Sequence, residues 1–121
     1  MPNQVEHFID GTRVIPGNGV RCKDMNPATG EVLAEVVLDE VSAADSAVAA
    51  AHAAFHGWSG TPVGERCQVM FCFKELLEQH FDELAQMIVD EHGKTMPEAR
   101  GDVRRGIDCV EYACGAPSLM M

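Results

Sequence analysis

The chain changes character within one short stretch, which reads Glu31-Val32-Leu33-Ala34-Glu35-Val36-Val37-Leu38-Asp39-Glu40-Val41-Ser42. Its first part alternates as a strand does, and the following apolar side chains fall on one face: Val32, Ala34, Val36 and Leu38. The other face mixes Leu33 and Val37 with Glu35, so we expect it to be partly covered as well. A helix is expected from Ser42 onward, because Asp45 three residues later completes a weak capping box.

Two turn signals on the N-terminal side of this stretch predict two β-hairpins. The first is Phe8-Ile9-Asp10-Gly11, which is followed by Thr12-Arg13-Val14. Asp-Gly tolerates the positive φ values of a type I′ turn, and apolar residues flank it. The second is Asn26-Pro27-Ala28-Thr29-Gly30, which joins a strand at 21–25 to the strand at 31–38.

The C-terminal side is predicted to be helical. The helix that opens at Ser42 should end near Phe55, before the Gly57-Trp58-Ser59-Gly60 break. A second helix starts at Thr61-Pro62, with proline in its tolerated first turn, and stops at Gly93. Its apolar pattern has a possible break around His80-Phe81.

The third helix has the clearest start in the sequence. Thr95-Met96-Pro97-Glu98 combines a capping box with a first-turn proline, and the helix should run from about Pro97 to Ala113. One stripe of this helix is apolar and consists of Val103, Ile107, Val110 and Cys114. The fold class predicted is therefore α+β, with two N-terminal β-hairpins followed by three helices.

Composition excludes several classes of function. The 121 residues suit one ordinary domain, and the net charge is −10, from 19 acidic residues against 9 lysines and arginines. This sign disfavours nucleic acid and anionic membrane surfaces as partners, and no apolar run reaches the roughly 20 residues that span a bilayer. Residues 1–6 lack the features of an export signal, and the five cysteines are an odd number. We expect reduced thiols and a cytoplasmic protein.

Three candidate sites have simpler structural explanations. Gly93-Lys94-Thr95 resembles the tail of a phosphate-binding P-loop, but Ile88 stands where the motif needs glycine, so a helix stop is expected. His52 and His56 have the spacing of paired zinc ligands but lack an evident third ligand, so no metal site is expected. None of the cysteines is expected to be catalytic; they are Cys22, Cys67, Cys72, Cys109 and Cys114.

The charges of the third helix leave two interpretations open. Arg100, Arg104 and Arg105 interleave with Glu98, Asp102, Asp108 and Glu111. One interpretation is a solvated face of weak pairs three or four residues apart within the helix. The other is an arginine that grips a ligand carboxylate with its two-pronged guanidinium. Spacing alone does not choose between them.

Several motifs occur in the order typical of the N-terminal part of aldehyde dehydrogenases. They are Phe8-Ile9-Asp10-Gly11, Asn26-Pro27-Ala28-Thr29-Gly30-Glu31-Val32, Ala54-Phe55 with Trp58 and Arg66, and Glu91-His92-Gly93-Lys94 with Glu98-Ala99. Together they span essentially the whole chain, which therefore resembles an N-terminal fragment of this family. The resemblance implies an aldehyde dehydrogenase α/β fold, in which residues 1–121 would form the N-terminal part of the NAD-binding domain, without the catalytic domain.

Residues 101–121 and Gln79-His80 narrow the resemblance to methylmalonate-semialdehyde dehydrogenases. This group converts malonate or methylmalonate semialdehyde to acetyl- or propionyl-CoA, with loss of CO2 and reduction of NAD. A cysteine thiolate attacks the aldehyde, hydride passes to NAD, and coenzyme A takes the acyl group. The alternatives are a hydrolysing aldehyde dehydrogenase, such as a succinate-semialdehyde or betaine-aldehyde type, and a stand-alone α+β interaction module.

The resemblance assigns one site residue to this chain. In the family, the nucleophile and the dinucleotide-contacting segments lie downstream of the matched region, so no catalytic, cofactor-binding or metal-binding residue is expected here. Arg105 is expected to bind substrate, because the arginine of the matching Arg-Gly pair is associated with holding the substrate carboxylate. Arg104 is the weaker candidate, because it aligns with a variable position.

Residues 1–121 on their own are expected to be catalytically inactive and to bind no cofactor. The final segment, residues 115–121, finishes on three apolar side chains, so we expect a chain that has been cut short. Apolar helix faces and unpaired strand edges predict a homo-oligomer, most simply a two-fold dimer.

Overall fold

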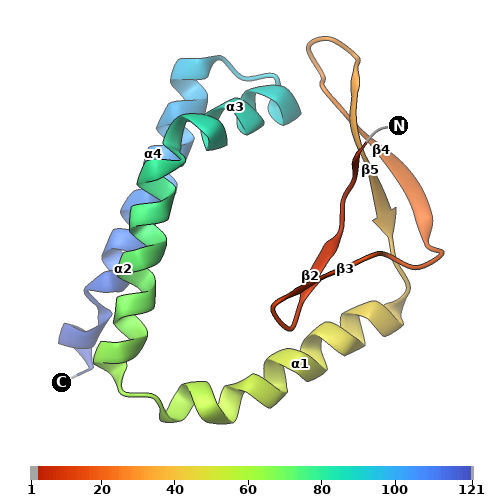
Figure 1. The fold of residues 1–121 in the computed structure, drawn as a ribbon. Coiled ribbons are helices and arrows are strands. Elements are labelled where there is room, and N and C mark those ends of the chain that lie inside the picture. Colours follow the sequence, from red (N-terminus) through yellow and green to blue (C-terminus); the bar gives the residue numbers. More distant parts are fainter. Residues whose placement is uncertain (1–2, 121) are drawn as a thin grey trace. The chain divides into compact units, whose positions relative to one another are not determined.

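The computed structural model describes residues 3–120, which fall into two compact units (Figure 1). Unit 1 spans Met1–Ser59 and unit 2 spans Gly60–Met121. The elements of unit 1 are β1 (Asn3–Gln4), β2 (His7–Ile9), β3 (Thr12–Val14), β4 (Val20–Met25), β5 (Val32–Leu38) and α1 (Val41–Gly60), whose last residue opens unit 2. Those of unit 2 are α2 (Val63–Gln79), α3 (Phe81–His92), α4 (Met96–Cys114) and the short 3₁₀ helix η1 (Ala116–Leu119).

Both predicted hairpins are confirmed. Strands β2 and β3 pair antiparallel, and the two turn residues have positive φ, 52° at Asp10 and 72° at Gly11. Strands β4 and β5 also pair antiparallel, and their turn is organised by Asn26, whose side-chain oxygen accepts the N–H groups of Ala28 at 2.9 Å and Thr29 at 3.1 Å. Local turn chemistry is therefore sufficient to specify both hairpins.

Strand β1 was not predicted from the sequence. It pairs in parallel with β5, so that β5 becomes the central strand of a three-stranded sheet with the order β1-β5-β4. The backbone N–H of Val5 continues this contact by donating to the carbonyl of Glu35 at 3.0 Å. A two-residue strand carries too few side chains to show a periodic pattern, so only its pairing partner reveals it.

The expected apolar face of β5 is not the more enclosed one. Val37, on the opposite face, is only 4% exposed, whereas Val32 is 40% exposed and Leu38 is 59% exposed. The two central residues of the expected face, Ala34 and Val36, are half-buried. Alternation in a strand distinguishes two faces, but it does not say which face another part of the chain covers.

The link between β5 and α1 is held by the carboxylate of Asp39. It accepts the N–H of Glu40 at 2.8 Å, the N–H of Gly17 at 2.9 Å and a bond from Nε2 of His7 at 3.2 Å. The loop before β4 passes close to the end of β5. A Cβ on Gly19 would lie 2.1 Å from the carbonyl oxygen of Leu38, so this position requires glycine.

Helix α1 differs from its prediction at both ends. It begins at Val41, so Ser42 lies inside the helix and does not form the expected capping box with Asp45. It also continues past Phe55 to Gly60. Glycine disfavours a helix by only about 1 kcal/mol and removes no hydrogen bond, whereas Pro62 lacks an N–H and marks the next helix start.

Unit 2 contains the best-packed part of the chain. The expected second helix is divided at His80, as its pattern allowed, so two hairpins are followed by four helices. Helices α2 and α4 lie side by side (Figure 1), and α3 packs on α4. A small core gathers at these contacts from Ala85, Ala99, Val103 and Ile107. The predicted helix start at Thr95 is confirmed. The backbone N–H of Thr95 (3.1 Å) and its hydroxyl (2.8 Å) both donate to the carboxylate of Glu98.

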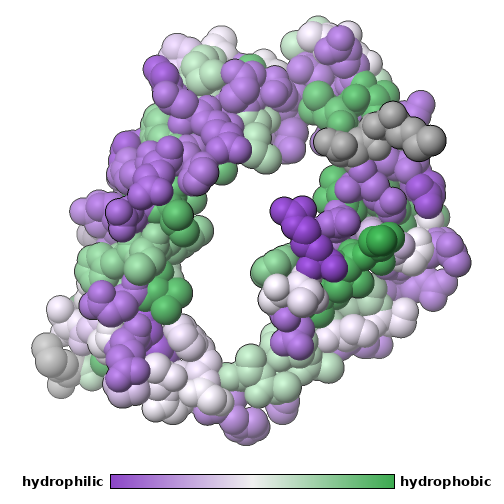
Figure 2. Space-filling view, viewed as in Figure 1, coloured by the Kyte–Doolittle hydropathy of each residue, from purple (hydrophilic) through white to green (hydrophobic). Residues whose placement is uncertain are grey.

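Apolar side chains remain exposed in both units. Figure 2 shows green, apolar surface on the strands as well as along the helices. The most exposed examples are Phe8, Ile15 and Val41 in unit 1 and Tyr112 and Leu119 in unit 2. Within residues 3–120, none of the helices is long and apolar enough to cross a membrane.

Candidate functional site

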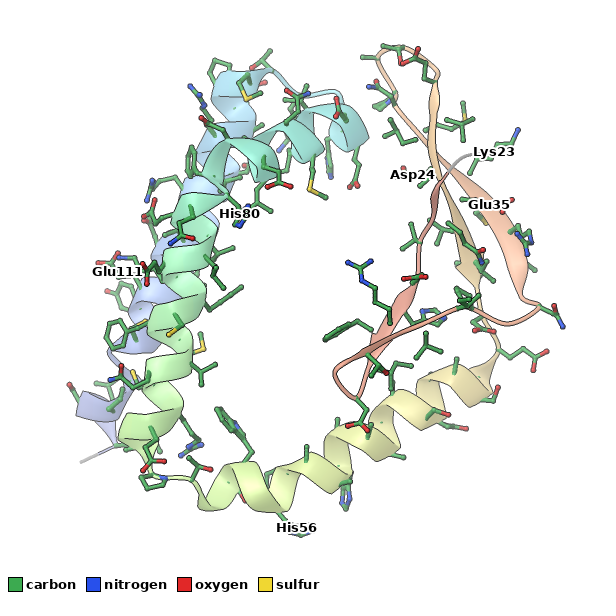
Figure 3. All side chains as sticks on the ribbon, viewed as in Figure 1. Lys23, Asp24, Glu35, His56, His80 and Glu111 are labelled. Carbon is green, nitrogen blue, oxygen red and sulfur yellow. The ribbon has the colours of Figure 1, made fainter. Side chains whose placement is uncertain are left out.

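Helix α4 carries three basic residues whose surroundings differ. Its charges pair mostly with the neighbouring helices, through Arg100–Asp82, Arg104–Glu78 and Lys74–Glu111. Glu111 is labelled on α4 in Figure 3. The expectation of weak pairs within one helix is therefore wrong for these residues. Spacing along one helix could not reveal them, because their partners lie 18 or more residues away in the sequence.

Arg104 is fully engaged by unit 2 itself. Its two terminal nitrogens donate to the two carboxylate oxygens of Glu78, at 2.6 Å and 2.9 Å, and its guanidinium lies 4.9 Å from the centre of the Phe81 ring. The hydrogen bonds raise the pKa of Arg104 and lower the pKa of Glu78. This guanidinium is already occupied by a carboxylate and is not available to a ligand.

Arg105, the residue proposed to bind substrate, is exposed and makes none of the hydrogen bonds or ion pairs found within residues 3–120. The neighbouring Asp102 is held by Lys94, whose hydrogen bond lowers the pKa of that carboxyl, and the charge of Arg105 lowers it further. Arg100 and Arg104 already have carboxylate partners. Arg105 is therefore the arginine of α4 whose guanidinium is free to bind a carboxylate from outside the described chain.

A groove that the sequence analysis did not identify lies on the same helix. It has a volume of about 430 Å³ and is lined mainly by apolar side chains of α2, α3 and α4, including Phe73, Leu77, Ile88 and Val110. Gly106, the residue after Arg105, forms part of its wall, and nothing lies within 4 Å of the place a Cβ would take there. The predicted apolar stripe of α4 was the signal for this groove, but the stripe gives no indication that it stays open.

The remaining candidates do not assemble a site. His52 and His56 are exposed on α1, with ring centres 5.9 Å apart (Figure 3 labels His56), and the described residues contain no cluster of three groups able to hold a metal. The Gly93-Lys94-Thr95 segment is a helix stop followed by a helix start, as expected: Gly93 has a φ of 69°, and Lys94 pairs with Asp102.

The cysteines are unpaired and belong to no common centre. Cys22, Cys72 and Cys109 are exposed, and Cys67 and Cys114 are buried. The thiol of Cys67 donates to the carbonyl oxygen of Cys114 at 2.9 Å, which is a packing contact between α2 and the end of α4. Lys74 is the basic group that acts on the buried Cys114, and its amine is bonded to Glu111 at 2.7 Å. No contact of the described residues assigns any of the cysteines the role of nucleophile.

The one strand-to-helix link between β5 and α1 is also unsuited to a dinucleotide phosphate. Phosphate sites of this kind use a glycine-rich turn with free N–H groups at a helix start. Here the link is Asp39-Glu40, two acidic residues, and the N–H of Glu40 is already bonded to Asp39. This link therefore does not fit the phosphates of NAD.

Comparison with known proteins identifies the family. The sequence pattern of the aldehyde dehydrogenase family matches residues 15–121. The chain belongs to the aldehyde dehydrogenase family. It is 45% identical to malonate-semialdehyde dehydrogenase 1 of Geobacillus kaustophilus over 97% of this chain, and 41% identical to the malonate-semialdehyde dehydrogenase of Pseudomonas aeruginosa over 96% of it.

A solved structure covers the whole of this aldehyde dehydrogenase chain. It is a Sinorhizobium meliloti protein described as a methylmalonate-semialdehyde dehydrogenase and crystallised with NAD, with a TM-score of 0.94 and 40% identity over 100% of this chain and 25% of that one. The chain spans about a quarter of the length of these relatives, 24% of the G. kaustophilus enzyme and 23% of the P. aeruginosa enzyme.

Proposed function

We propose that this chain is part of an NAD-dependent dehydrogenase that oxidises malonate or methylmalonate semialdehyde and transfers the acyl group to coenzyme A. The names of the G. kaustophilus and P. aeruginosa relatives support the substrate class, and the NAD in the S. meliloti crystal structure supports the cofactor. Within such an enzyme, residues 1–121 would form the N-terminal part of the NAD-binding domain.

The observation that carries this proposal is the contrast between Arg105 and its neighbours. A small semialdehyde with a carboxylate needs a cation that is not already neutralised. Arg100 and Arg104 are paired with carboxylates of unit 2, whereas the guanidinium of Arg105 is exposed and unpaired within residues 3–120. We assign Arg105 the task of binding the substrate carboxylate, because its guanidinium is exposed and has no carboxylate bonded to it within residues 3–120.

The chemistry attributed to this chain is limited to that binding step. NAD, when bound, accepts a hydride from the substrate. The link between β5 and α1 does not fit its phosphates, and no step of the oxidation is assigned to residues 3–120. We expect residues 1–121 alone to have no dehydrogenase activity.

The cellular setting and the assembly are also proposals. Five unpaired cysteines suit a reducing compartment such as the cytoplasm. The exposed apolar side chains of both units favour a homo-oligomer, which light scattering on the purified chain can test. A stable monomer at concentrations of tens of micromolar would contradict this expectation.

The test uses the whole protein that carries this chain, with malonate and methylmalonate semialdehydes and NAD, with and without coenzyme A. The expected products are acetyl-CoA and propionyl-CoA, each with one CO2 and one NADH. A free acid formed at the same rate without coenzyme A would instead support the hydrolysing alternative.

Arg105→Ala should weaken transition-state binding of the carboxylated substrates by roughly 2–4 kcal/mol, with a much smaller effect on uncharged aldehydes of similar size. Arg100→Ala, which removes the same charge five residues earlier on α4, is the matched control.

A further inference from the structure

Arg104 contacts both sides of the break between two helices. Helix α2 ends at Gln79 and α3 begins at Phe81, and His80 caps both helices. Glu78 precedes this break and accepts the two hydrogen bonds from Arg104, while Phe81 follows it and stacks against the same guanidinium. Figure 3 labels His80 at this junction. One side chain of α4 therefore contacts the last turn of α2 and the first residue of α3.

The geometry of this contact is more restrictive than that of its neighbour on α4. Two separate nitrogens of Arg104 meet two separate oxygens of Glu78, so the planes of both groups are fixed. Arg100 also uses two nitrogens, but both meet the same oxygen of Asp82, at 3.0 Å and 2.9 Å. The Arg104–Glu78 contact therefore sets the rotation of α4 about its axis more tightly than the Arg100–Asp82 contact.

Stability is a poor explanation for so specific an arrangement. The side chains of Arg104 and Glu78 are 47% and 40% exposed. Ion pairs with this degree of exposure are screened by solvent and contribute little to the free energy of folding. The fixed geometry of the Arg104–Glu78 pair can instead serve to orient a neighbouring side chain of α4.

That neighbouring side chain is Arg105. It follows Arg104 directly, about 100° further around the helix, and within residues 3–120 no ion pair or hydrogen bond fixes its guanidinium. The position of Arg105 therefore depends on how α4 is held, by its buried residues Val103 and Ile107 and by the contacts of Arg104. Catalytic efficiency is sensitive to displacements of about 1 Å in groups that position a substrate.

We propose that Glu78, Phe81 and Arg104 form a clamp that positions Arg105 for the carboxylate of the substrate. Arg104 and Glu78 are positioning residues, because they act through Arg105 and do not touch the ligand. This inference rests on the proposed function of Arg105, and it adds a specificity-determining contact at the α2–α3 break.

The experiment compares three single variants of the whole protein: Arg104→Lys, which keeps the charge but loses the two-pronged geometry, Glu78→Gln, and the control Arg100→Lys. For each, kcat and KM are measured with malonate semialdehyde and with an uncharged aldehyde of similar size. The clamp predicts that Arg104→Lys and Glu78→Gln lower kcat/KM about tenfold for the carboxylated substrate, mainly through KM, and change the uncharged one far less. Arg100→Lys should leave both values unchanged, and thermal melting confirms that each variant is folded.

The double variant Arg104→Lys/Arg105→Ala separates this inference from the proposed function. If Arg104 acts through Arg105, the double variant is no worse than Arg105→Ala alone. Additive losses, or equal losses of Arg104→Lys on charged and uncharged aldehydes, would overturn the clamp and leave the role of Arg105 intact. If Arg105→Ala itself does not discriminate between the two substrates, the proposed function fails first, and the clamp fails with it.

Discussion

The two units of this chain are stabilised in different ways. In unit 2, the side chain of Ile107 is 1% exposed and packs in a core with Ala85, Ala99 and Val103. In unit 1, the 20-residue helix α1 has no buried residue, and Val37 is the buried side chain of the sheet among the residues described. Unit 1 is organised instead by polar turn contacts around Asn26 and Asp39.

This difference shows that local order and burial can be separated along one chain. Hydrogen bonds within turns specify the hairpins of unit 1, although its apolar side chains remain exposed. Packing between α2, α3 and α4 gives unit 2 a small core. Substitutions should therefore have their largest effects at packed side chains in unit 2 and at turn side chains in unit 1.

The largest effect is expected for Ile107→Ala. Removal of a fully buried branched side chain loses its transfer free energy and leaves a cavity, so the free energy of unfolding should fall by about 2–5 kcal/mol. Urea unfolding followed by far-UV circular dichroism measures this loss. The matched control is Val48→Ala on α1, where the side chain is exposed and the change should stay within about 0.5 kcal/mol. Equal losses at both sites would contradict the contrast between the units.

A smaller effect is expected for Asn26→Ala in unit 1. The variant removes the side-chain acceptor of the N–H groups of Ala28 and Thr29, and only Asn26 is buried in this otherwise exposed turn. Because water can replace the lost acceptor, the cost should be about 0.5–1.5 kcal/mol, seen as faster amide hydrogen exchange in β4 and β5. Thr29→Ala, which removes one longer bond from the N–H of Glu31 at 3.2 Å, should cost less and serves as the comparison. Protection that is unchanged in Asn26→Ala would show that the turn does not depend on this side chain.

The sequence predicts those parts of the fold that local interactions determine. The hairpin turns and the start of α4 were predicted because their signals are local: Asp10-Gly11 requires positive φ, and Thr95 with Glu98 satisfies free N–H groups. The pairing of β1 with β5 and the burial of Val37 depend on distant residues, so periodicity did not reveal them. The length of α1 was underestimated because its C-terminal glycines were read as a break.

The same distinction applies to the candidate site. Sequence patterns placed Arg104 and Arg105 on one helix, and the resemblance to a family favoured Arg105. Only the fold shows that Glu78, 26 residues away, already occupies Arg104. The role of Arg105 stays a prediction, because the group it would bind is not part of the described chain.

The carboxylates of the two units should respond differently to salt. The pKa of Asp39 is lowered mainly by the backbone N–H groups of Gly17 and Glu40, and that of Glu78 mainly by the side chain of Arg104. Each lowered pKa stabilises the folded state above the ordinary pKa of the group, and this contribution is lost as pH falls through the folded value. NMR titration should show the midpoint of Glu78 rising toward its ordinary value in about 1 M salt, where charges are screened within about 3 Å. The midpoint of Asp39 should move less, and equal movement would mean that the charge of His7 dominates there.

The smallest effects are expected at two glycines inside α4. Nothing lies within 4 Å of the position that a Cβ would take at Gly101 or at Gly106, so alanine fits this chain at both sites. Each substitution should raise the free energy of unfolding of unit 2 by up to about 1 kcal/mol, because alanine favours a helix and glycine does not. The two sites differ in one respect, since Gly106 lines the apolar groove formed by α2, α3 and α4 and Gly101 does not. In the whole protein, Gly101→Ala should keep full activity on malonate semialdehyde, whereas Gly106→Ala should raise its KM if ligand or chain fills that space. Equal KM values in both variants would show that the groove can lose a methyl-sized volume without consequence for the substrate.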